Sequence, residues 1–255
     1  MIPHRSRSAG TIREIGVAQR RGLRQSCRRN LRRSIINNPV QRATSARTAI
    51  WCLGALASIA IAAASYRYFL GIGPIPPGII ENTFAAPWLL VHVAGAASAL
   101  LVGSFQFIGR LRQASPRIHR WTGRIYAIAC LVGALSGFVL ALGTTAGPVA
   151  ASGFGILAVI WAVTISYGWQ RARERRFAEH RRWMIRSWAL TFAAVTLRIY
   201  LPAAGAMGIP FETSYPIISF LAWVPNLILA EIYLSRTQGK RPRSPTSGLA
   251  IQQQG

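Results

Sequence analysis

Three histidines lie in or beside apolar stretches of this sequence, where an imidazole can bind a metal or exchange a proton. His119 opens an apolar run within the segment Ser115 to Leu142, and His180 precedes another such run. Two neutral imidazoles from different helices can hold a haem iron or contribute to a metal site. His119 and His180 are therefore candidate ligands of a haem b. Neighbouring arginines instead favour a structural role or contact with lipid phosphate.

His92 and Arg198 form a second candidate site, because each lies at a similar depth inside an apolar run. A buried guanidinium needs an acceptor, and the topology offers Glu81, Glu212 or an anionic ligand. Gln106 falls on the helix face of His92 by its spacing. We expect His92, Gln106 and Arg198 to line a ligand pocket, suited to a carboxylate, a quinone oxygen or a haem propionate.

The other chemical signals are weaker. Arg124 and Glu231 lie near the same boundary with opposite charge, which favours a structural ion pair. No metal site is predicted, since the sequence has no Asp and Cys130 should lie in the middle of the membrane. The sequence also lacks a nucleophile elbow, a P-loop and a zinc-protease motif, which argues against a hydrolase or an ATPase. If the protein is an enzyme, we expect a membrane oxidoreductase.

The composition indicates the elements that must position these residues. The 255-residue chain is 51% hydrophobic and only 14% charged, which is typical of a membrane protein. The net charge of +24 does not predict nucleic-acid binding, because the arginines are in blocks between apolar runs.

Six of these apolar runs are each about the 20 residues that a helix needs to cross a bilayer. They cover residues 48–70, 86–109, 121–143, 148–169, 184–205 and 214–235. The sequence therefore predicts an all-α, polytopic membrane protein with six transmembrane helices in a bundle.

The connections between the runs alternate in charge. Arginines fill the connections after the second and fourth runs and the segment after the sixth, whereas residues 71–85, 144–147 and 206–213 contain no Lys or Arg. This alternation predicts that both termini lie in the cytoplasm of a bacterial cell, with the spans in its inner membrane. The arginine-rich loops would attract anionic lipid.

The ends of the chain are polar. Residues 1–47 hold twelve arginines and one acid, which favours a disordered cytoplasmic tail. A transit peptide, a twin-arginine signal around Arg32 and a lipid-binding tail are alternatives. We expect a transmembrane domain over 48–236 and a second disordered tail over 237–255.

Three segments, His92 to Arg112, Ile118 to Leu142 and Glu179 to Pro202, resemble the uncharacterised bacterial membrane-protein family called domain of unknown function 2306. The pieces H-R-W-x-G-R-x-Y and H-R-x-W-M-x-R-S carry the resemblance, which implies a multi-span inner-membrane protein without an assigned activity. A weaker likeness is to transmembrane two-haem cytochrome b proteins, in which histidines on helices separated by one span hold haem. His119 and His180 have that separation, whereas His92 lacks a histidine partner on the fourth run.

Three functions remain open. The first is a membrane redox protein, with haem at His119 and His180 and a quinone or propionate near His92 and Arg198. The second is a small-anion transporter or channel lined by His92 and Arg198. The third is a non-catalytic scaffold or lipid-binding protein that uses the arginine-rich loops.

Overall fold

The computed structural model of the chain describes residues 39–72, 82, 84–107 and 109–238, and all regular structure in them is helical. The chain divides into two units, residues 1–54 and 55–255, and the packing below concerns the second. The elements are α2 (Pro39–Ser65), the 3₁₀ helix η1 (Tyr66–Leu70), α3 (Ala85–Gln106), α4 (Gly109–Ala114), α5 (Pro116–Leu142), α6 (Gly147–Arg173), α7 (Phe177–Thr191), α8 (Ala193–Ala206), α9 (Phe211–Leu221) and α10 (Val224–Gln238).

Six helical segments of the described chain are long and apolar enough to cross a membrane, which confirms the predicted all-α class and number of spans. They are Thr48–Leu70, Ala85–Gln106, Pro116–Leu142, Gly147–Arg173, Phe177–Ala206 and Phe211–Thr237. The third and fifth begin before the apolar runs do, so that His119 and His180 lie near the first turns of α5 and α7. Proline is well placed at the start of α5, where a backbone N–H has no intrahelical partner.

The side chains are distributed as expected for helices in lipid. On α5 the large apolar residues Ile128 and Leu135 are exposed, whereas Tyr126 and Ser136 are buried. Polar groups are placed inside a membrane bundle because hydrocarbon offers them no hydrogen-bond partner. Five serines of the described spans are likewise at most 2% exposed: Ser58, Ser104, Ser136, Ser187 and Ser219.

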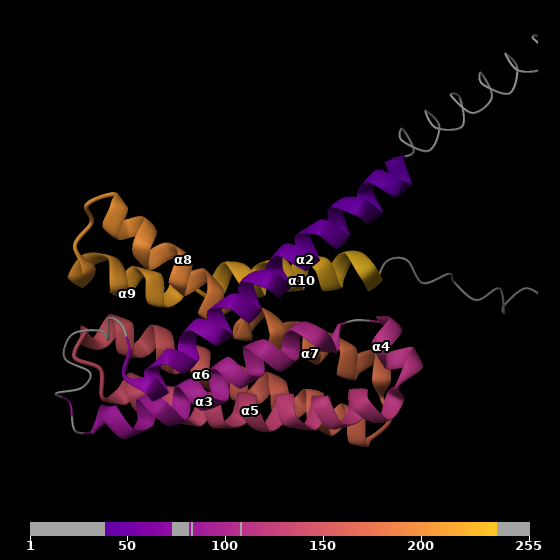
Figure 1. Cartoon of the computed structure of the whole chain (residues 1–255), viewed down its shortest axis with the longest axis horizontal. Helices are drawn as coiled ribbons and strands as arrows, with labels where there is room; N and C mark the ends of the chain where they lie inside the picture. The colour runs from indigo at the N-terminus through magenta and orange to yellow at the C-terminus, as the bar shows by residue number, and fades with distance from the viewer. Residues whose placement is uncertain (1–38, 73–81, 83, 108, 239–255) are drawn as a thin grey trace, which may run out of the picture. The chain divides into compact units, whose positions relative to one another are not determined.

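The helices α3, α5 and α6 lie side by side, and α6 also packs against α7 (Figure 1). Glycines allow the closest approach. A Cβ atom built on Gly95 of α3 would lie 2.5 Å from the backbone nitrogen of Gly133 on α5. The two backbones therefore touch at this crossing, as small residues permit in membrane bundles.

The fifth and sixth spans are interrupted. The fifth breaks at Phe192 between α7 and α8, and the sixth breaks before Val224 between α9 and α10. Pro225 explains the second break, because it has no N–H and disfavours a helix before it. At this break the Ala222 carbonyl accepts hydrogen bonds from the Thr196 hydroxyl and from the Asn226 amide, the latter at 3.0 Å.

The helix α2 begins at Pro39, nine residues before the predicted boundary of the N-terminal tail, although the candidate span within it begins at Thr48. The remainder of that predicted tail, residues 1–38, lies outside the described residues. So does most of the predicted C-terminal tail, from residue 239 onward.

Candidate functional site

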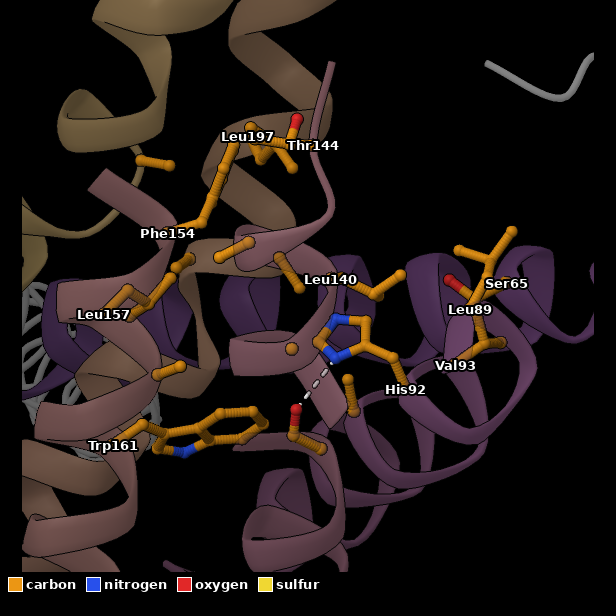
Figure 2. Close-up of a pocket in the computed structure, with 18 of the residues that line it drawn as sticks. Ser65, Leu89, His92, Val93, Leu140, Thr144, Phe154, Leu157, Trp161 and Leu197 are labelled. Carbon is orange, nitrogen blue, oxygen red and sulfur yellow. Dashed lines mark hydrogen bonds between the residues drawn. The ribbon is translucent and has the colours of Figure 1, made fainter. Parts of the chain in front are cut away.

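A cavity of about 280 Å³ lies among α3, α5, α6 and α8, and both His92 and Arg198 line it. Figure 2 shows the His92 ring beside this cavity, with Trp161 below it. The lining is mainly apolar and includes leucines from four helices: Leu89 of α3, Leu140 of α5, Leu157 of α6 and Leu197 of α8. Aromatic rings of Phe154, Trp161, Tyr68 and Tyr215 complete it.

The His92 imidazole is held in one orientation. Its Nδ1 lies 2.8 Å from the carbonyl oxygen of Gly133 (Figure 2). A carbonyl only accepts, so Nδ1 must carry a proton and donate it, which leaves Nε2 of the neutral ring as an acceptor. Gly137 leaves room for the ring, because a Cβ atom there would lie 3.0 Å from its Nδ1 and Cε1. His92 thus presents Nε2 as a hydrogen-bond acceptor at the cavity.

Arg198 brings a positive charge to the same cavity. Its Nη1 donates to the carbonyl oxygen of Ala194 at 3.1 Å, and its Nη2 donates to the hydroxyl of Ser65 at 3.0 Å. Among the described residues no carboxylate forms an ion pair with Arg198. Glu212 is therefore not its partner, and Glu81 lies outside the described residues. Guanidinium donors remain for an oxygen acceptor.

Several other polar groups in the lining are already satisfied. Asn82 accepts from the backbone nitrogens of Phe84 and Ala85, each at 3.1 Å, and donates to the Gly143 carbonyl at 2.9 Å. The Trp161 indole donates to the Thr191 hydroxyl at 3.0 Å, and Thr191 in turn donates to a backbone carbonyl.

Two tyrosine hydroxyls in the lining are not satisfied in this way. Within the described chain, neither the Tyr68 nor the Tyr215 hydroxyl has a hydrogen-bond partner, and both side chains line the cavity. The groups available to a ligand are therefore the acceptor of His92, the donors of Arg198 and these two hydroxyls.

Gln106 is not part of this cavity. It lies at the far end of α3, fourteen residues or about 21 Å of helix from His92. Its amide donates to the Thr122 hydroxyl at 2.6 Å, and its side chain does not line the cavity. Spacing along one helix gives a shared face, but the rise along the helix separates the two residues.

The predicted Arg124–Glu231 ion pair is also corrected. Glu231 on α10 pairs with Arg186 on α7, at 2.5 Å from its Nε, because these two helices pack together. Arg124 on α5 instead lies over the Trp121 ring, with its Cζ 5.0 Å from the ring centroid.

At the Arg-rich end of the spans, His119 and His180 are half-buried and close enough to interact electrostatically. Nδ1 of His180 lies 2.7 Å from the carbonyl oxygen of Gly168, which leaves its Nε2 available to a ligand or proton. The same end carries exposed ion pairs, and a hydrogen bond from Arg171 lowers the pKa of the Glu174 carboxyl. No group of three or more metal-ligating side chains exists in the part of the chain that the structure describes.

A buried hydroxyl cluster lies between the His92 cavity and the Arg-rich end. The sequence did not predict this cluster. The Tyr126 hydroxyl lies 3.1 Å from that of Ser187 and 3.0 Å from that of Thr191, with Cys130 beside them. Tyr126 and Cys130 are four residues apart on α5, and Ser187 and Thr191 are four apart on α7, so each pair shares a helix face. The missing information was that these two faces meet.

The fold and cavity define an integral membrane protein with a partly polar pocket inside its helices. A family model described as "Predicted membrane protein (DUF2306)" matches residues 89–234. This range covers most of the second to sixth spans and includes His92, His119, His180 and Arg198. The chain belongs to this family, as the resemblance implied. No curated protein and no solved structure matches it.

Proposed function

We propose that the protein binds a membrane-soluble, single-ring molecule of the quinone class in the cavity of His92 and Arg198. The observation that carries this proposal is the pairing of one acceptor, His92, with one cation, Arg198, in a mainly apolar lining. A ring that carries one oxygen able to donate a hydrogen bond and one able to accept complements this pair. A hydroxyl of the reduced form donates to Nε2 of His92, and a carbonyl or anionic oxygen accepts from Arg198.

The size of the cavity supports a ring. An apolar cavity of about 150 Å³ accommodates benzene. The present cavity, at about 280 Å³, leaves space for ring substituents or the start of a tail. The mainly apolar lining disfavours a small inorganic anion, because the anion would lose most of its hydration there. We therefore rank the small-anion transporter second.

Quinone content of the purified protein tests the proposal. The protein would be extracted from membranes in a mild detergent, and its bound quinones would be measured by chromatography after solvent extraction. We expect near-stoichiometric quinone with the wild type and little with Arg198→Gln. Arg124→Gln is the matched control, since Arg124 lies over Trp121 at the other end of the bundle. Equal trace amounts in all three preparations would contradict the proposal.

A haem at His119 and His180 is a separate candidate, favoured by the orientation of His180. Its Nδ1 donates to Gly168, as the non-ligating nitrogen of a metal-bound histidine commonly donates to a carbonyl. A Soret band in the purified protein that His180→Ala removes would support this candidate. Its absence after haem supplementation would exclude it.

The Arg-rich end is proposed to face the cytoplasm of a bacterial inner membrane and to contact anionic lipid. Exposed arginines there, including Arg117, Arg120 and Arg176, support this orientation. The exposed Trp121 ring beside Arg124 also suits a membrane interface.

A further inference from the structure

The buried cluster of Tyr126, Ser187 and Thr191 is the starting point. These side chains are 1%, 0% and 3% exposed, and they come from α5 and α7. The Tyr126 hydroxyl is central, because it contacts both of the other hydroxyls. A hydroxyl both donates and accepts, so a chain of them can pass a proton along without any member keeping a charge.

On one side, this cluster reaches the cavity. Thr191 lines the cavity together with His92, and its hydroxyl donates to the Ser187 carbonyl. When this hydroxyl turns from the carbonyl toward the cavity, a proton can pass between Thr191 and His92 through water in that space. A volume of about 280 Å³ is sufficient for several waters, since each occupies roughly 30 Å³ in the liquid. Nε2 of His92 is the proton acceptor at this end.

On the side away from the cavity, the cluster faces the Arg-rich end, where His119 and His180 lie. His119 precedes Tyr126 by seven residues and His180 precedes Ser187 by seven, so each pair shares a helix face about 10 Å apart. Thr122 lies within this interval on α5 and accepts a hydrogen bond from Gln106. Because both imidazoles are half-buried at the boundary, they can exchange protons with the aqueous phase.

We propose that the protein conducts protons between its Arg-rich end and the His92 cavity, through Tyr126 and the hydroxyls that contact it. A proton enters at His119 or His180 and passes by Thr122 to Tyr126. It then passes by Thr191, whose hydroxyl lies 3.0 Å from that of Tyr126, to the cavity. It leaves at His92 for the aqueous phase beside Thr144 and Thr145, which line the same cavity in the connection between α5 and α6. Water completes the path beside Thr122 and within the cavity. This inference does not depend on a quinone, since the path exists in the chain itself.

Proton flux into proteoliposomes tests this path. Vesicles with an internal pH-sensitive dye would be given a membrane potential by a potassium gradient and valinomycin. We expect acidification by the wild type above that of protein-free vesicles, and a slower rate in D₂O. Tyr126→Phe should reduce the flux to the level of protein-free vesicles. Ser104→Ala should retain it, because the Ser104 hydroxyl is buried but donates only to Leu100 of its own helix.

Folding of each variant would be checked by its size-exclusion profile and thermal transition. If Tyr126→Phe does not fold, Thr191→Val takes its place, with the same expected loss, because Thr191 joins Tyr126 to the cavity. The inference is overturned if the wild type conducts no faster than protein-free vesicles, or if a folded cluster variant conducts as fast as the wild type. Quinone content would be measured on the same preparations, so that failure of the ligand proposal is seen separately.

Discussion

His92 donates its Nδ1 proton to the carbonyl oxygen of Gly133, 2.8 Å away on the neighbouring helix. This bond depends on the glycine crossing of α3 and α5, where Gly95 lies three residues from His92 and contacts the backbone at Gly133. The packing of two helices therefore fixes the tautomer of the imidazole and the atom that it offers to the cavity.

Gly137→Ala should displace the His92 ring. The new methyl group would lie 3.0 Å from two ring atoms, and overpacking of this kind costs about 1–3 kcal/mol. We expect a lower melting temperature and weaker ligand binding. Gly205→Ala is the control, because nothing lies within 4 Å of a Cβ atom there and its stability should be unchanged or slightly raised. Thermal unfolding in detergent compares the two variants, and an equal response would contradict the described ring position.

Gly95→Ala should be more harmful than Gly137→Ala. Its Cβ atom would meet the backbone of α5 at 2.5 Å, and a backbone cannot rotate away as a side chain can. We expect loss of the folded protein in detergent, measured by size-exclusion chromatography. Gly155→Ala is the matched helix-interior control, with only side chains nearby, at 3.9 Å. A Gly95→Ala protein as stable as that control would show that α3 and α5 do not cross here.

The ion pair of Glu231 with Arg186 can be tested by a double-mutant cycle of Arg186→Gln and Glu231→Gln. The pair is partly exposed, so we expect a coupling of about 0.5–1 kcal/mol in unfolding free energy. A second double-mutant cycle, of Arg124→Gln and Glu231→Gln, should give no coupling in unfolding free energy. A larger coupling for Arg124 would restore the pair that the sequence suggested.

Orientation can be tested with single cysteines in a background without the native three. A cysteine at Ala178, at the Arg-rich end, should react with a membrane-impermeant maleimide only after the cells are opened. A cysteine at Thr145, at the other end, should react in intact cells. The reverse labelling pattern would place the Arg-rich end outside.

The sequence predicted the helical class, the six spans and the pairing of His92 with Arg198, because hydropathy and depth in the membrane are local properties. It did not predict which helix faces meet. Gln106 was expected beside His92 and instead binds Thr122, and Glu231 was expected beside Arg124 and instead binds Arg186. These contacts depend on tertiary packing, which spacing along one helix does not determine.

The sequence also did not predict the break at Phe192. No proline or glycine marks it. The Thr191 hydroxyl before the break donates to the Ser187 carbonyl of its own helix, and the Thr196 hydroxyl after it donates to the Ala222 carbonyl of the sixth span. Bonds of the first kind compete with the helix and bend it, yet isolated threonines rarely predict a break. Arg198 lies on α8, just after this break.

The most direct test of the account is the affinity of the cavity for a short-tailed quinol, measured by titration of the protein in lipid nanodiscs. We expect saturable binding of one molecule. Arg198→Gln should weaken this binding by roughly 10- to 100-fold, because hydrogen bonds from a charged group contribute about 1.5–3 kcal/mol. Arg124→Gln should bind as the wild type does. Binding that does not saturate, or that is the same in all three proteins, would contradict the assignment of this cavity as a ligand site.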